Sequence, residues 1–574
     1  MSITTTKTGK RRGPWLAIGL SLLACAGVLY AALHLPGWLA GSPPAKPVLS
    51  AAAQQAELEQ ARKQAALVTA EDHRLVTQLR NIPWNAWAYL DRTHGAPTMI
   101  LTARTDPYTL DSLLRLGAAQ RIDPTTVVLI DSVLVGPGAK LILNAPGTTL
   151  RMTSTPTGFT SLVGWKGSIA LTGAPDHPLT LTSWDPATGK PDQQVTDGRA
   201  YIRVAGSDLQ SHFAALSDLG FWSGRTGGLA VTGNESGPGT GSITGTTVHA
   251  GYYGLFSSST TGLTIADSTF DTAAADGILL HQGSIGATIR TTFARHNAGS
   301  GIVADRGTTT VTLRNVTAEL NEEDGIRLDG RPLADRPGAA GDSLDGHHGF
   351  RVQDSAARFN TGSGVLVWDA DETVVTGTNV VNNAEGIVVR GPADRTKISA
   401  NTVTTSDGAA IAVRDGAVDV AVDHNIVSGA DTGVQVRAAR VDVHDNTVTG
   451  ARAHGVSFQG AAQGSAAHNN SLAGSGPSGL DLLRLDVGAP VSVSNNSDNQ
   501  WQVTMSVNDR LHRLFGDHPL LALWALLLLV PLVPRLFGRR RRGWPAHPHP
   551  NPRPYPEHPP TSSYSASSYS AAAR

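Results

Sequence analysis

Apolar residues recur along this chain in short bursts that each follow a small residue. From Gly254 to Gly479 a small residue precedes an apolar residue, any residue and a second apolar residue. The phrases begin at Gly254, Gly277, Gly301, Gly325, Gly364, Gly386, Ala410, Gly433, Gly455 and Gly479, in steps of 23, 24, 24, 39, 22, 24, 23, 22 and 24 residues. A period of this size is typical of solenoids, propellers and repeat arrays.

A second phrase, Asn followed by small, hydroxyl or apolar residues, stands about ten residues before several of these glycines. It occurs at Asn315, Asn401, Asn425, Asn446 and Asn470. Neither a leucine lattice nor glycine-free helical runs accompany the repeat, whereas short β-branched triplets between Gly, Asn, Asp and Thr are typical of strands and turns. We therefore predict an all-β fold, a right-handed parallel β-helix whose inward residues stack from coil to coil.

Two apolar stretches flank the repeats and predict membrane spans. The first follows Lys7, Lys10, Arg11 and Arg12, and the second precedes a run of four arginines that ends at Arg542. The positive-inside rule then places both termini in the cytoplasm and the β-helix on the extracytoplasmic side of the cell membrane. An alternative reading of the segment before Cys25 is a lipobox that would lipidate this cysteine. As the only cysteine, Cys25 excludes an intrachain disulfide framework.

The remaining segments complete the predicted organisation. A Pro-rich linker precedes residues 51–80, which are rich in Ala, Gln, Glu and Arg and are predicted to form a helical stalk or cap. The expected order is a cytoplasmic N-terminus (1–13), a transmembrane helix (14–40), a linker, helical stalk and cap (41–125), the β-helix (126–498), an amphipathic connector (499–518), a transmembrane helix (519–537) and a disordered basic, Pro-rich cytoplasmic tail (538–574).

Side chains alternate across a strand, so the first and third residues after each glycine are expected inside and the fourth outside. The fourth residues would form a column with one side chain every 4.8 Å or so, close to the length of a sugar unit. The column reads Ser258, His281, Asp305, Asp329, Trp368, Arg390, Arg414, Arg437, Gln459 and Leu483. Stacked arginines repel one another unless an anion lies across them, which favours a carboxylated linear polysaccharide as ligand.

Other interpretations of this column remain open. Each arginine could pair with a nearby carboxylate, such as Asp394, Asp415 or Asp419, on a solvated face. Trp368 could stack on a sugar or be an ordinary surface residue. His281, one coil from Asp305 and Arg306, is a candidate general base. The pair His347 and His348 lies in an insertion that we expect to form a loop over the groove rather than a metal site. The formal net charge of −1 disfavours nucleic acid as a partner, and no cofactor motif is present.

Four consecutive coils resemble the periplasmic mannuronan (alginate) C5-epimerases. The similar segments are Tyr252-Tyr-Gly-Leu, Asp276-Gly-Ile-Leu-Leu-His281, Ser300-Gly-Ile-Val-Ala-Asp-Arg306 and Asp324-Gly-Ile-Arg-Leu-Asp329. The resemblance implies that His281 removes the C5 proton of a uronate and that Arg306 neutralises its carboxylate. Three side chains of the family's histidine motif, Tyr-Gly-Ile-Asp-Pro-His-Asp, are replaced here by Leu279, Leu280 and Gln282, and Asp276 stands in place of its tyrosine.

The resemblance leaves three function classes open. The first is a polyuronate C5-epimerase-like isomerase, with Tyr252, Tyr253 or water returning the proton. The second is a lyase, which results if the substituent on O4 is lost instead. The third is a non-catalytic scaffold of a surface polysaccharide export complex, with a membrane glycosyltransferase as a possible partner. Tyr253, Asp305, Asp329, Trp368, Arg390, Arg414 and Arg437 are the predicted substrate-binding residues.

Overall fold

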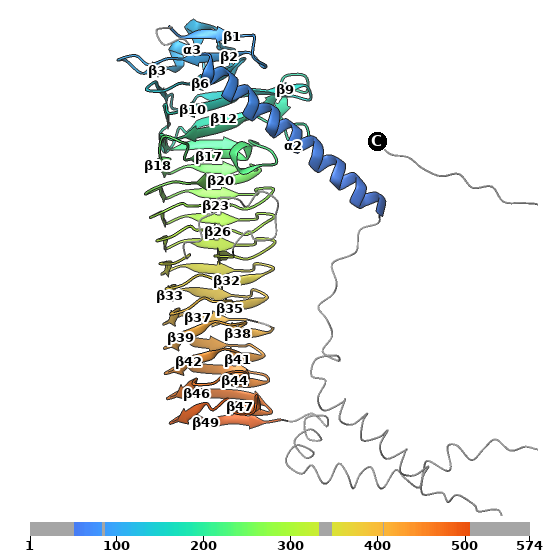
Figure 1. The fold of residues 1–574 in the computed structure, drawn as a ribbon, viewed down its shortest axis with the longest axis vertical. Helices are drawn as coiled ribbons and strands as arrows, with labels where there is room; N and C mark the ends of the chain where they lie inside the picture. The colour runs from blue at the N-terminus through green and yellow to red at the C-terminus, as the bar shows by residue number, and fades with distance from the viewer. Residues whose placement is uncertain (1–50, 83–86, 332–346, 406, 505–574) are drawn as a thin grey trace, which may run out of the picture. The chain divides into compact units, whose positions relative to one another are not determined.

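The computed structural model describes residues 51–82, 87–331, 347–405 and 407–504. Each coil of the chain adds one strand to each of three sheets, and Figure 1 shows the coils following one another from β1 to β49. Neighbouring strands of one sheet are therefore about two dozen residues apart in sequence and pair in parallel. The predicted right-handed parallel β-helix is confirmed.

Sheet A contains sixteen strands, and every neighbouring pair is parallel except β1 with β2. Its strands in order are β1 (Tyr89–Asp91), β2 (Thr98–Leu101), β6 (Ser132–Val135), β10 (Ser161–Trp165), β14 (Tyr201–Ala205), β17 (Gly228–Thr232), β20 (Tyr253–Ser258), β23 (Ile278–His281), β26 (Ile302–Asp305), β29 (Ile326–Asp329), β32 (Ser363–Trp368), β35 (Glu385–Arg390), β38 (Ala409–Arg414), β41 (Thr432–Val436), β44 (His454–Gly460) and β47 (Ser478–Leu485).

Sheet B contains fifteen strands. In order they are β3 (Tyr108–Thr109), β7 (Lys140–Asn144), β11 (Ser168–Thr172), β15 (Asp208–His212), β18 (Thr240–Thr244), β21 (Thr264–Ala266), β24 (Thr288–Arg290), β27 (Thr312–Arg314), β30 (Arg351–Gln353), β33 (Val374–Thr376), β36 (Lys397–Ser399), β39 (Val418–Asp423), β42 (Ala439–His444), β45 (Ala466–His468) and β48 (Ser492–Ser494).

Sheet C contains eighteen strands, including the short β9 and β13, which pair antiparallel with β8 and β12. Its strands are β4 (Ala119–Arg121), β5 (Thr126–Leu129), β8 (Thr149–Thr155), β9 (Gly158–Phe159), β12 (Leu179–Asp185), β13 (Lys190–Pro191), β16 (Ala214–Ser217), β19 (Thr247–His249), β22 (Thr269–Asp271), β25 (Phe293–Arg295), β28 (Thr317–Glu319), β31 (Ala356–Arg358), β34 (Asn379–Val381), β37 (Thr402–Thr404), β40 (Ile426–Ser428), β43 (Thr447–Ala451), β46 (Ser471–Gly476) and β49 (Ser497–Val503).

The repeated glycine is needed because the coils approach each other closely at its position. A Cβ at Gly301 would lie 2.7 Å from the carbonyl oxygen of Gly325 and 2.8 Å from Asn321 Nδ2. The first and third residues after the glycine, such as Ile302 and Ala304, are buried in the central core, as predicted. The second residue faces outward but is also buried in most coils, because neighbours on the outer face cover it, as at Val303.

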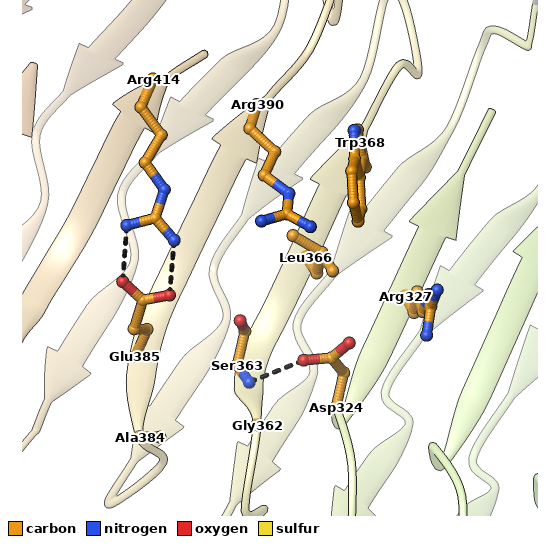
Figure 2. A pocket seen from close by; sticks show the side chains of 10 residues that line it. All are labelled: Asp324, Arg327, Gly362, Ser363, Leu366, Trp368, Ala384, Glu385, Arg390 and Arg414. Atoms are coloured by element: carbon orange, nitrogen blue, oxygen red, sulfur yellow. Dashed lines mark hydrogen bonds and ion pairs between the residues drawn. The ribbon is translucent and has the colours of Figure 1, made fainter. Parts of the chain in front are cut away.

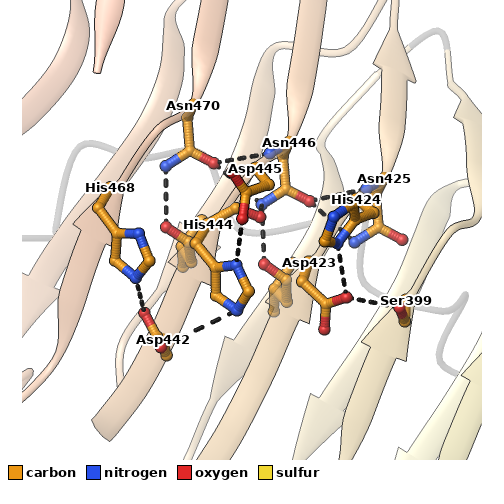
Figure 3. Close-up of polar contacts among 12 residues, drawn as sticks. Ser399, Asp423, His424, Asn425, Asp442, His444, Asp445, Asn446, His468 and Asn470 are labelled. Atoms are coloured by element: carbon orange, nitrogen blue, oxygen red, sulfur yellow. Dashed lines mark hydrogen bonds and ion pairs between the residues drawn. The ribbon is translucent and has the colours of Figure 1, made fainter. Parts of the chain in front are cut away.

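The asparagine phrase forms a buried ladder at the turn between sheets B and C. Asn425 Oδ1 accepts hydrogen bonds from the backbone N–H and from Nδ2 of Asn401, at 3.0 Å each. Asn446 and Asn470 continue the ladder, as Figure 3 shows. Asn315 is not a member, because it occupies the left-handed position of the turn, with φ of 51°. A buried ladder satisfies backbone donors that no strand can pair.

Helix α2 (Ala51–Arg80) matches the predicted helix but is not an end cap. Leu75 packs in a cluster with Ile100, Leu134 and Val163, which lie on β2, β6 and β10. Beside this apolar contact, the Glu71 carboxylate accepts hydrogen bonds from the Arg74 guanidinium and from the Tyr201 hydroxyl. The helix therefore covers the outer face of sheet A at the N-terminal coils.

The predicted limits of the β-helix are wrong at both ends. β2, β3 and β4 already form a coil before residue 126, with α3 (Leu110–Leu116) between β3 and β4. These strands lack the glycine phrase, which explains why the sequence pattern did not reveal them. At the other end, residues 499–503, predicted to begin a connector, belong to β49. The transmembrane helices predicted at 14–40 and 519–537, the tail at 538–574 and most of the insertion loop lie outside the described residues.

Candidate functional site

The outer face of sheet A carries three columns of side chains. One column is the predicted series of fourth residues: Ser258 pairs with His281, Asp305 with Asp329, Asp329 with Trp368, Trp368 with Arg390 and Arg390 with Arg414. The register shifts between Ser457 and Gln459, so Arg484 rather than Leu483 is opposite Gln459. A second column is largely apolar, and a third consists of the residues just before each glycine.

His281 and Asp305 form a hydrogen-bonded pair across adjacent coils. His281 Nδ1 lies 2.7 Å from Asp305 Oδ1, and the two side chains are 20% and 19% exposed. Arg306 follows in the turn after β26, with φ of 52°, and its Nε lies 3.7 Å from Asp305 Oδ2. The structure thus brings the two predicted catalytic residues to the same carboxylate on the same outer face.

Tyr253 and Asp276 each stand just before a repeat glycine, Tyr253 in the coil before His281 and Asp276 in the same coil as His281. The pKa values of both side chains are shifted. Burial raises the pKa of the Tyr253 hydroxyl, and the Asp276 carboxylate raises it further. Burial also raises the pKa of Asp276, to about 6, although its Oδ1 accepts a hydrogen bond of 2.8 Å from the Ser300 N–H. The Tyr253 hydroxyl therefore stays protonated at neutral pH, whereas the Asp276 carboxylate loses its proton slightly below neutral pH.

A pocket of about 260 Å³ lies on the same face, over β29, β32, β35 and β38. Figure 2 shows its lining: Asp324, Arg327, Gly362, Ser363, Leu366, Trp368, Ala384, Glu385, Arg390 and Arg414. The Asp324 carboxylate accepts a hydrogen bond of 2.7 Å from the Ser363 N–H. Burial nevertheless raises the pKa of Asp324. The pocket combines cations with an apolar floor at Leu366.

Trp368 does not present a free face to a sugar, contrary to the prediction. The guanidinium carbons of Arg331 and Arg390 each lie 3.3 Å from the centre of its ring. Two guanidinium groups cannot both fit at that distance on one side of a ring, so they cover opposite faces. Arg331 also bonds Asp329 at 2.8 Å. The indole is therefore a wall that holds two arginines rather than a stacking platform.

Three of the other predicted binding residues, Arg414, Arg437 and Asp329, are paired within the protein. Arg414 donates two hydrogen bonds, of 2.9 and 2.8 Å, to Glu385, and Arg437 Nε donates to Gln459 Oε1 at 2.8 Å. Burial alone would raise the pKa of Asp329, but hydrogen bonds from Arg331 and Arg327 outweigh it and lower the pKa. The alternative of an acid-paired arginine thus applies to Arg414, with Glu385 rather than an aspartate as its main partner.

Sequence reasoning missed Asp276, Asp324, Glu385 and Arg331. The first three precede a repeat glycine by one residue, a position that strict alternation would place inside with the first and third residues, so the pattern did not reveal them. Arg331 has no periodic signal, because it belongs to the insertion and turns back onto Trp368.

A separate group of histidines lies on the outer face of sheet B, as Figure 3 shows. The rings of His444 and His468 stack with centres 4.8 Å apart, and His468 Nε2 lies 3.1 Å from Asp442 Oδ1. Among the described residues, no group of His, Cys, Asp or Glu side chains has the arrangement of a metal site. We therefore regard this group as a polar surface.

The described helices include none with the length and apolarity to cross a bilayer. The two predicted spans were not open to this test, because they lie outside the described residues.

Comparisons with known proteins concern the fold. A family model described as "right handed beta helix region" matches residues 217–332 and 340–500. Comparison with curated protein sequences finds no match.

Similar solved structures include the periplasmic alginate epimerase AlgG, at 14% identity and a TM-score of 0.49, covering 71% of this chain and 86% of that one. The A-module of the Azotobacter vinelandii mannuronan C-5 epimerase AlgE6 has 15% identity and a TM-score of 0.39, covering 64% and 91%. The catalytic domain of a GH87 alpha-1,3-glucanase has 14% identity and a TM-score of 0.32, covering 67% and 69%. The strand pairing of this chain is that of a right-handed parallel β-helix, and the family-model match covers part of the same coils.

Proposed function

We propose that this protein modifies an acidic linear polysaccharide on the outer face of sheet A, most simply as a polyuronate C5-epimerase. The observation that supports this best is the His281–Asp305 pair with Arg306 beside it. The carboxylate that orients the histidine comes from the following coil, so it does not depend on the side chains that this chain lacks around His281.

The proposed reaction starts with binding of a uronate unit so that its carboxylate lies against Arg306. The guanidinium neutralises the carboxylate and stabilises the negative charge that develops when the C5–H bond breaks. A neutral imidazole that donates from Nδ1 to Asp305 presents the lone pair of Nε2, which accepts the C5 proton. Nε2 has no hydrogen-bond partner within the described part of the chain.

Inversion at C5 requires that a proton returns from the opposite face of the ring. Tyr253, on β20 one coil before His281, is the proposed donor because burial keeps its hydroxyl protonated. If the intermediate instead expels the substituent at C4, a C4–C5 double bond forms and the same site acts as a lyase. In epimerisation the electron pair left at C5 forms a new C5–H bond. In the lyase reaction the same pair forms the C4–C5 double bond while the bond from C4 to its oxygen substituent breaks.

The test is incorporation of deuterium from D2O at C5 of polymannuronate, followed by nuclear magnetic resonance. The wild-type protein is expected to exchange this position, and His281→Gln to lower the rate by 10²-fold or more, roughly the contribution of a general base. His444→Gln, on sheet B, is the matched control and should exchange normally. Growth of ultraviolet absorbance would identify a lyase, and binding without either change would leave only the non-catalytic alternative.

Action outside the membrane, and a glycosyltransferase or export complex as partner, remain parts of the proposal. They depend on the predicted spans at 14–40 and 519–537. Neither follows from the geometry of the site.

A further inference from the structure

Helix α2 leaves the outer face of sheet A accessible on one side of His281 only. It packs over β2, β6, β10 and β14 through Leu75 and Glu71. Asp72 extends the contact to Arg225, at 3.1 Å, near the start of β17. Only β17 and β20 separate this covered region from His281 on β23. An extended polymer bound at His281 therefore continues toward β26, β29, β32 and β35.

Arg390 lies on that accessible side and lacks a counter-ion. Its Nε is buried without a hydrogen-bond partner, and no carboxylate of the described residues lies within ion-pair distance of it. Its neighbours are already satisfied, since Arg414 is paired with Glu385 and Arg331 with Asp329. Burial and the nearby charges of Arg414 and Arg331 lower the pKa of Arg390 and outweigh the opposite effect of the more distant carboxylates of Asp415 and Asp324.

Trp368 fixes the position of this unpaired guanidinium. The guanidinium carbon of Arg390 lies 3.3 Å from the ring centre, and Figure 2 shows both side chains at the pocket, beside Leu366 and Ser363. A guanidinium held close to a ring still has N–H groups that point away from the ring and can bind a carboxylate. The pocket thus offers a preorganised anion site with an apolar floor.

The distance between this site and His281 is set by the coils. Sheet A runs β23, β26, β29, β32, β35, so four steps separate the strand of His281 from that of Arg390. At the usual spacing of strands these steps span about 19 Å. Because a sugar unit of an extended polysaccharide is about as long as one step, four units bridge the two sites.

We propose that Arg390, positioned by Trp368, binds the carboxylate of a uronate unit about four units away from the unit at His281. This inference rests on the proposed function and names its substrate more closely, as a chain of about five or more uronate units. Binding of a remote unit adds affinity for long chains without changing the chemistry at His281. Arg390 is accordingly a binding residue and Trp368 a positioning residue.

The test uses the full chain and mannuronate oligomers of two to eight units, with C5 deuterium exchange as the measured reaction. The wild-type kcat/KM is expected to rise about tenfold or more between trimer and hexamer, mainly through KM. In Arg390→Gln the hexamer-to-trimer ratio should fall to near one. Trp368→Phe, which keeps a ring under the guanidinium, should retain part of the ratio. Arg395→Gln removes an exposed arginine that pairs with Glu372, away from sheet A, and should leave the ratio unchanged.

The outcomes separate this inference from the proposed function. Exchange with a hexamer-to-trimer ratio that Arg390→Gln does not alter overturns the anchoring role and leaves the chemistry at His281 intact. If no oligomer exchanges, calorimetric titration with hexamer decides, since binding that Arg390→Gln weakens tenfold supports the anchor without the chemistry. The inference is overturned if Arg390→Gln does not weaken the binding of hexamer and if hexamer binds no more tightly than shorter oligomers. Circular dichroism of each variant checks that it is folded.

Discussion

Asp276→Asn should stabilise the protein at neutral pH and not in acid. The carboxylate keeps its hydrogen bond from the Ser300 N–H, and Asn can accept the same bond through Oδ1, so the substitution removes little besides the charge. In the folded chain burial raises the pKa from 3.8 to about 6. A difference of about 2 pKa units corresponds to about 3 kcal/mol.

The sign of the stability change follows from the difference in proton binding to Asp276 between the folded and unfolded states. The folded state binds the proton more tightly than the unfolded state, so the contribution of Asp276 to stability is greatest below pH 3.8 and is lost as pH rises to about 6. Above pH 6 the wild type carries the full cost of a buried charge, up to about 3 kcal/mol, which the variant avoids. Near pH 4 the two proteins should differ by less than about 1 kcal/mol.

The assay is urea unfolding followed by circular dichroism at pH 4 and pH 7.5, with wild type and variant measured side by side. Asp271→Asn is a control of opposite sign. Burial alone would raise the pKa of Asp271, but hydrogen bonds from His296, Thr272 and His249 lower it, so its charge stabilises the fold at neutral pH. A loss of stability in Asp276→Asn at pH 7.5, or a change that does not depend on pH, would show that burial does not raise the pKa of Asp276.

Three further predictions concern the ladder, the helix and the site. Asn425→Ala removes buried hydrogen bonds to Asn401, Asn446 and the Ile398 carbonyl, and should lower the free energy of unfolding by about 3 kcal/mol, whereas the exposed Thr402→Ala should cost under about 0.5 kcal/mol. Leu75→Ala should cost about 2–5 kcal/mol in urea unfolding, and Leu58→Ala, on the exposed part of α2, almost nothing. Arg306→Ala should lower the C5 exchange rate by 10²-fold or more in the assay described above, with Arg306→Lys retaining part of it. If the two variants of a pair lose stability or exchange rate to the same extent, the role given to the first residue of that pair is contradicted.

Much of the fold was predictable because close packing of coils imposes a strict pattern on the sequence. A side chain at Gly301 would collide with the next coil, so the glycine recurs wherever a coil crosses that position. The same spacing predicted that Asp305 and Arg306 lie one coil from His281. Repetition made these neighbours visible without any coordinates.

Features without a period were not predictable from the pattern. Helix α2 was predicted by its composition, but its position was not, because the contacts that hold it include the buried pair Glu71 and Arg74 as well as apolar residues. Arg331 reaches Trp368 from an insertion, and the pairing of Arg414 with Glu385 joins a strand end to a strand start. Such contacts depend on side-chain reach rather than on spacing.

We propose that an acidic polysaccharide lies along the outer face of sheet A from His281 toward Arg390. Hydroxyl-radical footprinting with an octamer of mannuronate tests it most directly, because one experiment reports on histidines of two different faces. We expect the octamer to lower the oxidation of His281 and Trp368 and to leave that of His444 and His468, on sheet B, unchanged. Protection of the sheet B histidines with His281 unaffected would contradict it.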